Sequence, residues 1–261
     1  MIMEPIKLTG EYDPSPACRG MCAQCGKEHV VPIGPAREPA MALLRTMERE
    51  RRIDLSVPAD QADPRLTIDY LYGPARGQMF GVLVVRDQSG NTGVLKAFSG
   101  QYNSLWQVDG WVDPLLDVQR FYRETRDAER HIKRLGRDIV ALPDGSPQRR
   151  SLVAVRKKAS QTLMREIHGM FMVSNFRGER VPLPQAVYGS EGIPTGTGDC
   201  CAPKLLNHAA MHGLIPLGLA EFYCGRTNRS ETRHHGEIYP SCLHKCGRIL
   251  GYMVCGLEER E

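Results

Sequence analysis

The stretch Gly196-Thr-Gly-Asp-Cys-Cys-Ala-Pro-Lys-Leu-Leu206 decides the fold that the sequence predicts. Its adjacent cysteines follow a glycine-rich turn and open an apolar run that is typical of a helix. The later stretch Tyr239-Pro-Ser-Cys-Leu-His-Lys-Cys246 opens a further predicted helix in the same way. Thiolates at the starts of two helices can meet at one tetrahedral metal ion. We therefore predict a Zn²⁺ site with the ligands Cys200, Cys201, Cys242 and Cys246.

The role of this zinc ion depends on how many of the four thiolates bind it. If all four bind, the coordination sphere is closed and the site is structural. If only one of Cys200 and Cys201 binds, one position stays open for water, as in catalytic zinc sites. The sequence is compatible with both arrangements.

The N-terminal segment, residues 1–35, carries another cysteine cluster, Cys18-Arg-Gly-Met-Cys-Ala-Gln-Cys-Gly-Lys-Glu-His29. A Cys-x-x-Cys-Gly turn is typical of a zinc knuckle, because glycine lets backbone N–H groups approach the thiolates. The same spacing occurs in radical S-adenosylmethionine iron–sulfur enzymes, but the β/α repeats of their barrel are not found here. A cluster without metal is the third interpretation. We predict a zinc knuckle with the ligands Cys18, Cys22, Cys25 and His29.

The nine cysteines among 261 residues bound the class of protein. Cys224 and Cys255 stand apart from both clusters and are expected to be core residues. The sequence shows no secretion signal and no apolar run of membrane-spanning length, so we expect a cytoplasmic protein without a membrane partner. Clustered cysteines then favour metal binding over disulfides. The net charge of +4 is compatible with a nucleic-acid partner.

Hydrophobic periodicity predicts a mixture of helices and strands. An apolar stripe predicts a helix over residues 38–52, and two buried runs predict a β-hairpin over residues 78–98. Two charged helices joined by a tight turn predict an antiparallel helical hairpin. These helices span residues 114–135 and about 148–168, and the remaining predicted elements are helix 200–212, strand 214–223 and helix 242–255.

The second helix of this hairpin is strongly basic. Clustered Lys and Arg on one element are the usual footprint of nucleic-acid binding, although a solvated helix face can have the same composition. The loop of residues 226–235 is basic as well. We predict RNA contacts by Arg149, Arg150, Arg156, Lys157, Lys158, Arg229 and Arg233.

The order of hairpin, Cys-bearing helix, strand and Cys-bearing helix resembles the zinc cytidine-deaminase superfamily, including its bacterial toxin-type members. Cys200 aligns with the first ligand of that family, and Cys242 with Cys246 aligns with its later pair of cysteines. The resemblance implies a zinc-activated water molecule and a Glu that carries the proton. Ala202 stands at the position of this Glu. The candidate substitutes are Asp199 and Glu221.

A second resemblance covers residues 73–255. The segments Gly77–Val85, Leu95–Gly100, Gly196–Leu206, Pro216–Phe222 and Tyr239–Cys242 look like the N-terminal region of long-form RluA-type RNA pseudouridine synthases. The block Gly-Asp-Cys-Cys-Ala-Pro-Lys-Leu-Leu is its most specific part. The synthase signature His-Arg-Leu-Asp has no counterpart in this sequence. The resemblance therefore implies an RNA-modification setting rather than pseudouridylation by this chain.

These observations predict an α/β protein with a deaminase-like three-layer sheet, a helical-hairpin insertion and a small N-terminal zinc knuckle. We expect an RNA-binding or accessory protein that holds one or two Zn²⁺ ions, lacks the usual catalytic Glu and could partner an RNA-modification enzyme. The alternative is a divergent zinc-dependent deaminase or hydrolase acting on a nucleobase or nucleotide. A third interpretation is a structural zinc protein with a protein partner. The expected divisions are 1–35 (zinc knuckle), 36–72 (helix and linker), 73–112 with 182–261 (deaminase-like domain) and 113–181 (insertion).

Overall fold

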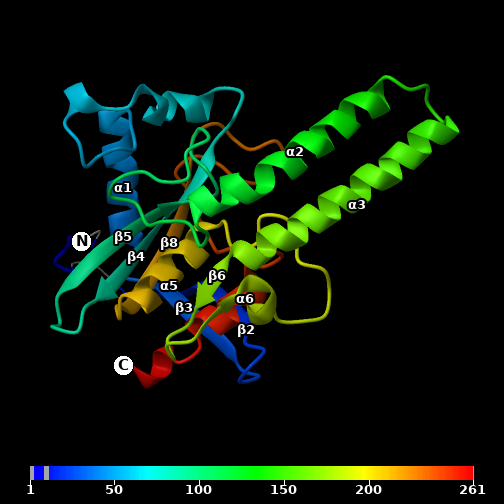
Figure 1. Ribbon diagram of the computed structural model, residues 1–261. Coiled ribbons are helices and arrows are strands. Elements are labelled where there is room, and N and C mark those ends of the chain that lie inside the picture. Colours follow the sequence, from blue (N-terminus) through cyan, green and yellow to red (C-terminus); the bar gives the residue numbers. More distant parts are fainter. Residues whose placement is uncertain (1–2, 9–11, 261) are drawn as a thin grey trace.

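The computed structural model describes residues 3–8 and 12–260. A five-stranded antiparallel sheet forms its centre, in the strand order β1-β5-β4-β8-β9 (Figure 1). The predicted α/β class is therefore confirmed, and the predicted hairpin over residues 78–98 is the pair β4 and β5. The strands are β1 (Glu4–Pro5), β4 (Gln78–Arg86), β5 (Thr92–Phe98), β8 (Ile215–Cys224) and β9 (Ile238–Tyr239).

The central strands β4 and β8 are buried on both faces, as their continuous apolar runs predict. Phe80 lies opposite Phe222 in the register, and the two rings stack with their centroids 5.7 Å apart. Helix α5 (Cys201–Met211) covers the face to which Gly81 belongs. A Cβ atom on Gly81 would lie 2.6 Å from the Cβ atom of Cys201, so α5 sits directly on the strand. On the other face, the ring of Trp111 packs against Phe80 at 5.6 Å.

An N-terminal β-hairpin packs against the last helix of the chain. Strands β2 (Asp13–Met21) and β3 (Glu28–Gly34) pair with each other, and β2 lies along α6 (Gly247–Val254). The two backbones meet at glycines, because a Cβ atom on Gly20 would lie 2.3 Å from the carbonyl oxygen of Gly247. Helix α1 (Arg37–Glu50) follows β3 and packs on β8.

A long helical hairpin projects from the body of the molecule (Figure 1). Helix α2 (Val118–Val140) and helix α3 (Pro147–Met170) run antiparallel and pack on each other. Each begins at a polar cap, since Asp117 accepts a hydrogen bond from the backbone N–H of Arg120, and Ser146 accepts one from that of Arg149.

Short elements connect the hairpin to the sheet. They are β6 (Met172–Ser174), β7 (Arg180–Pro182) and α4 (Leu183–Ala186), and single-turn 3₁₀ helices cover residues 59–61, 64–66, 68–72 and 257–259. The predicted boundaries differ most from the structure at two helices. Helix α2 spans Val118–Val140 rather than residues 114–135, and α6 begins at Gly247, after a turn that contains Cys242. Within the described residues, no helix combines the length and the apolar character needed to cross a bilayer.

Candidate metal centre

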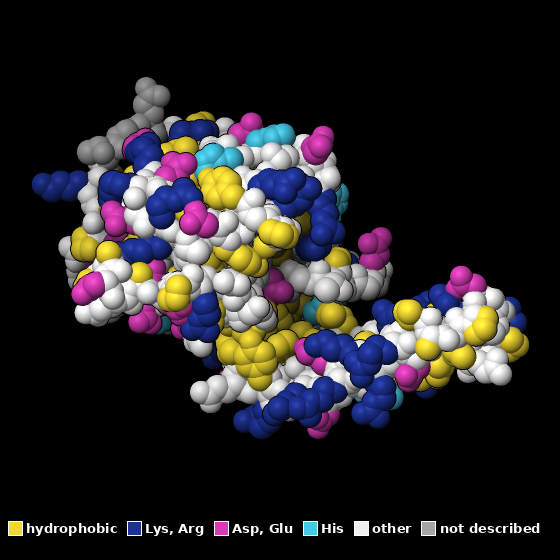
Figure 2. Space-filling view, turned by 90° about the horizontal axis from the view of Figure 1, so that it is seen from above, with side chains coloured by type: hydrophobic (Ala, Val, Ile, Leu, Met, Phe, Trp, Pro, Cys, Tyr) yellow, Lys and Arg dark blue, Asp and Glu magenta, His cyan; other side chains and the backbone are white. Residues whose placement is uncertain are grey.

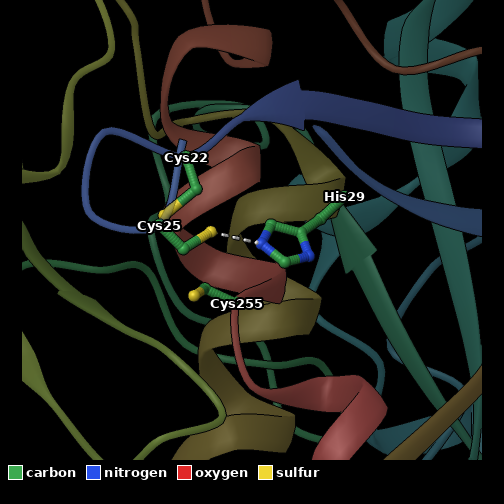
Figure 3. Close-up of side chains that lie close together, drawn as sticks. All are labelled: Cys22, Cys25, His29 and Cys255. Carbon is green, nitrogen blue, oxygen red and sulfur yellow. Dashed lines mark hydrogen bonds between the residues drawn. The ribbon is translucent and has the colours of Figure 1, made fainter. Parts of the chain in front are cut away.

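Three thiols and one imidazole converge where the N-terminal hairpin meets the C-terminus (Figure 3). The possible ligand atoms of Cys22, Cys25, His29 and Cys255 all lie within 4.8 Å of one another. Cys22, His29 and Cys255 are buried, and Cys25 is half-buried. A set of this composition and spacing can hold a metal ion.

The turn between β2 and β3 presents the first two thiols. The backbone N–H of Cys22 donates to the carbonyl oxygen of Lys27 at 2.9 Å, and the N–H of Gly26 donates to the carbonyl oxygen of Cys22 at 3.0 Å. Gly26 has a φ of +69°, a conformation that side chains disfavour. His29 then follows at the start of β3, so a segment of eight residues supplies three of the four groups.

The fourth group comes from the far end of the chain. Cys255 follows α6 directly, and its carbonyl oxygen accepts a hydrogen bond from the backbone N–H of Phe176 at 3.0 Å. The close contact between β2 and α6 brings it to the turn, since a Cβ atom on Gly251 would lie 2.3 Å from the carbonyl carbon of Met21. The glycines of α6 are therefore part of how the cluster is assembled.

The pKa values of Cys25 and Cys255 are shifted in opposite directions. Burial raises the pKa of Cys25, but hydrogen bonds from the backbone of Lys27 and from the side chains of His29 and Cys22 outweigh burial and lower the pKa to about 6. The Cys25 Sγ lies 3.1 Å from Nε2 of His29. The pKa of Cys255 is raised to about 12. Burial is the main cause, and contact with the thiols of Cys22 and Cys25 raises the pKa further. Loss of that proton therefore requires a compensating positive charge.

His29 turns one ring nitrogen toward the thiols and the other toward a carboxylate. Its buried Nδ1 has no hydrogen-bond partner among the described residues and lies 3.8 Å from Oε1 of Glu258. Metal-binding histidines commonly pair their second nitrogen with a carboxylate, which fixes the orientation of the ring. Glu258 is placed to do so after a small movement of its exposed side chain.

Cys18, the fourth ligand predicted from the sequence, is not in this cluster, and Cys255 stands in its place. Cys18 lies within β2 rather than in the turn, opposite Val31 of β3. Its thiol points into the core, where burial and the charge of Glu221 raise its pKa to about 12. Strand β2 continues to residue 21, so Cys18 is too far along the strand to reach the turn.

The predicted ligand set at the starts of the two helices is not assembled in the described part of the chain. Cys200 precedes α5 and contacts Cys246, whose thiol raises the pKa of Cys200 together with burial. Cys201 turns the other way, and its Sγ donates to the carbonyl oxygen of Met79 at 3.4 Å. Cys242 lies in the turn before α6. Among the described residues, the group whose possible ligand atoms all lie close together is Cys22, Cys25, His29 and Cys255. None of the four cysteines of the predicted helix-start site belongs to it.

Glu221, one of the two carboxylates nominated for catalysis, caps α5 from a neighbouring strand. Its Oε1 accepts hydrogen bonds from the backbone N–H of Ala202 at 2.9 Å and from the hydroxyl of Ser241 at 3.0 Å. Burial raises the pKa of Glu221 to about 7, against these hydrogen bonds and the charge of Arg233. Asp199, the other candidate, has a pKa raised by burial and opposed by the charges of Lys204 and Lys245.

The predicted RNA-contacting residues occupy two places. Arg150, Arg156, Lys157 and Lys158 are exposed on α3, whereas Arg149 donates to the carbonyl oxygen of Leu142 and is half-buried. Figure 2 shows Lys and Arg side chains gathered along the projecting helical hairpin of α2 and α3. In the loop of residues 226–235, Arg229 is exposed and Arg233 stacks over the ring of Tyr239.

Sequence reasoning missed Cys255 because no local spacing marks it. The pair Cys255-Gly256 does repeat the Cys25-Gly26 pair of the turn between β2 and β3, and Gly256 also has a positive φ of 88°. However, Cys224 and Cys246 are followed by glycine too, so this signal does not single out one cysteine. Only the packing of β2 on α6 identifies Cys255 as the fourth member of the cluster.

Comparison with models of known protein families, with curated proteins and with solved structures gives no significant match. The function is therefore inferred from the chain's own residues.

Proposed function

We propose that this chain is a zinc-stabilised RNA-binding module that acts as an accessory in RNA modification. The observation that carries the proposal is the charge of the helical hairpin. Residues 118–170 hold thirteen Lys or Arg and six Asp or Glu, a net charge of +7, while the whole chain has a net charge of +4. The remainder is thus net negative, and the positive charge is concentrated on the one element that projects from the body.

This concentration supports nucleic acid as the partner. Arg156, Lys157 and Lys158 are consecutive, exposed, and without an ion pair to any described residue. Lys and Arg side chains that have no ion pair can neutralise the phosphates of a nucleic-acid strand, and counterions are released when they do so. RNA rather than DNA is part of the proposal, as the resemblance expected from residues 73–255 implies.

Zinc is the metal that suits the cluster of Cys22, Cys25, His29 and Cys255. Three thiolates and one imidazole form a usual set for structural zinc, and a closed sphere of four protein ligands leaves no position for water. The buried, unpartnered Nδ1 of His29 beside Glu258 fits a metal-bound imidazole. A bound dication would also stabilise the thiolate of Cys255, which burial otherwise disfavours. The zinc would hold the N-terminal hairpin to the end of α6.

A deaminase-like layering of the core is part of the proposal. The β4–β5 hairpin, α5, β8 and α6 follow each other in the order that the deaminase resemblance predicts, and β8 lies beside β4. A role in proton transfer is disfavoured for Glu221, because its Oε1 already accepts hydrogen bonds from Ala202 and Ser241. Binding rather than deamination is therefore the function we propose.

Metal analysis of the purified full-length chain tests the zinc site. We expect about one zinc per chain, retained in Cys224→Ala and Cys18→Ala and lost in Cys255→Ala, with circular dichroism to check folding. Cys224 is a suitable control because it is buried and lies outside the cluster. Zinc retained in Cys255→Ala but lost in Cys18→Ala, or iron with visible absorbance, would contradict the site.

Fluorescence anisotropy with a short single-stranded RNA tests the RNA-binding surface. The triple variant Arg156→Ala, Lys157→Ala, Lys158→Ala should bind at least about tenfold more weakly than the unaltered chain at low salt. The matched control, Lys7→Ala, Arg45→Ala, Arg49→Ala, removes three cations from exposed positions on the body and should bind nearly as well as the unaltered chain. Equal losses in both triple variants would point to net charge alone, and no loss in the α3 variant would reject the hairpin as the contact surface.

A further inference from the structure

A cavity of about 460 Å³ lies at the foot of the helical hairpin, where α2 and α3 join the body. Its apolar lining includes Leu115, Leu116 and Met170, and the end of α5 contributes a pair of histidines, His208 within the helix and His212 directly after it. The volume is in the range of small-ligand pockets, and an apolar lining with a few polar groups is their usual composition. Neither the zinc cluster nor the exposed cations of α3 line this cavity.

The two histidines form a flat stack beside the cavity. Their ring centroids are 4.0 Å apart and the rings are inclined by only 22°. Nδ1 of His212 lies 2.8 Å from the carbonyl oxygen of His208, and since a carbonyl can only accept, Nδ1 carries the proton. When His212 is neutral, its Nε2 is therefore left as an acceptor.

His208 remains uncharged near neutral pH. Burial and the neighbouring His212 lower its pKa to about 4, against the opposing charge of Asp113. An uncharged imidazole can stack against another aromatic ring without the cost of desolvating a charge.

Charged groups stand around this apolar and aromatic surface. Arg120 and Arg180 line the cavity, and Arg180 is exposed with no ion pair to any described residue. The carboxylate of Asp113 also lines it and accepts one hydrogen bond, from the side chain of Gln107 at 2.8 Å. Guanidinium groups bind phosphate, and carboxylates accept hydrogen bonds from the exocyclic amino groups of bases.

We propose that this cavity binds a single unstacked nucleobase of an RNA strand whose phosphates run along the hairpin. The inference rests on the proposed RNA-binding function and adds to it the place where one base is held. An inorganic anion would use the arginines but not the apolar lining. A base uses the apolar surface, the imidazole faces and the hydrogen-bonding groups together, as in single-strand-binding proteins that stack bases on aromatic side chains.

Titration of the full-length chain with cytidine 5′-monophosphate, followed by NMR of the histidine ring protons, tests the pocket. We expect saturable shifts of His208 and His212, and loss of the His212 shift in His208→Ala. Ribose 5-phosphate, which lacks the base, should shift both resonances much less than the nucleotide does. Absence of any shift at millimolar nucleotide, or equal shifts with ribose 5-phosphate, would overturn the proposal.

The same titration in the triple variant of Arg156, Lys157 and Lys158 separates this proposal from the function it rests on. If the hairpin is the phosphate surface, that variant loses RNA affinity but still shows the nucleotide shifts. In the converse experiment, His208→Ala should weaken binding of a short single-stranded RNA roughly five- to 150-fold, the range measured for removal of one stacking side chain. Gln61→Ala, at an exposed position outside the cavity, α3 and the loop of residues 226–235, serves as the folding control.

Discussion

At the scale of single residues, Glu221 caps the N-terminus of helix α5, a role that the residue directly before a helix usually has. Helix α5 begins after Cys200, whose side chain makes no capping hydrogen bond. Glu221, from strand β8, instead accepts the N–H of Ala202 in the first turn of that helix. A carboxylate near a helix N-terminus is also favoured by the helix dipole. The sequence nominated Glu221 as a possible proton carrier because it could show an acid near the motif but not what that acid contacts.

The raised pKa of Glu221 predicts a specific dependence of stability on pH. The pKa is about 7 in the folded chain against 4.5 for an unperturbed Glu side chain, so the folded state binds more protons between these values. The contribution of Glu221 to the free energy of unfolding is greatest below pH 4.5 and decreases as the pH rises to 7. Above pH 7 it changes no further. The variant Glu221→Gln cannot titrate and should gain roughly 3 kcal/mol relative to the unaltered chain between pH 4.5 and 8.

Urea unfolding of both proteins at several pH values between 4.5 and 8 measures this difference. The exposed Glu191→Gln serves as the control and should follow the unaltered chain. Parallel curves for Glu221→Gln and the unaltered chain would show that Glu221 is not held protonated by burial.

At the scale of elements, hydrophobic periodicity predicted the helices and strands that a short stretch of sequence determines by itself. The β4–β5 hairpin and the α2–α3 pair were foreseen because apolar spacing and turn residues determine them. The Cys/His cluster was predicted only where its members lie close in sequence, at Cys22, Cys25 and His29. The packing of β2 against α6 determines the side to which Cys18 points and brings Cys255 to the cluster. No spacing within one segment of the sequence encodes that contact.

The close contact of β2 with α6 predicts that Gly251→Ala destabilises the chain and weakens zinc binding. In an exposed helix, replacing glycine by alanine usually stabilises by up to about 1 kcal/mol. Here the added Cβ atom would lie 2.3 Å from the carbonyl carbon of Met21, so the backbones must separate, at a cost of about 1–3 kcal/mol. Separation also moves Cys255 away from Cys22, and zinc affinity should fall.

Chemical denaturation and competition with a zinc-binding dye measure these two effects. Gly136→Ala is the matched control, because Gly136 lies inside α2 and the nearest atom to its added Cβ is 4.0 Å away, at the end of the Arg156 side chain. Gly136→Ala should be neutral or stabilising. A stabilised Gly251→Ala would contradict the close packing of β2 on α6.

At the scale of the whole molecule, the cluster of Cys22, Cys25, His29 and Cys255 joins residues 22–29 to residue 255, and the chain between them includes strands β4, β5, β8 and β9 of the sheet and the helical hairpin. A ligand that binds only the folded state stabilises it in proportion to the logarithm of its free concentration. Removal of zinc by a chelator should lower the free energy of unfolding by about 4 kcal/mol relative to zinc at a thousand times its dissociation constant. Thermal melts at graded free zinc measure this, and Cys255→Ala should show a melting temperature independent of zinc.

The separation of charge between hairpin and body gives the last prediction. If RNA phosphates lie along α3, the logarithm of the affinity falls linearly with the logarithm of salt, with a slope of about −0.7 per phosphate contacted in a single strand. Removing Arg156, Lys157 and Lys158 should make this slope shallower by about 2. The variant His208→Ala should lower affinity at every salt concentration and leave the slope unchanged, because an uncharged ring releases no counterions. Binding isotherms between about 50 and 300 mM salt distinguish the two. A common change of slope in both variants would mean that the cavity and the hairpin do not contact separate parts of the RNA.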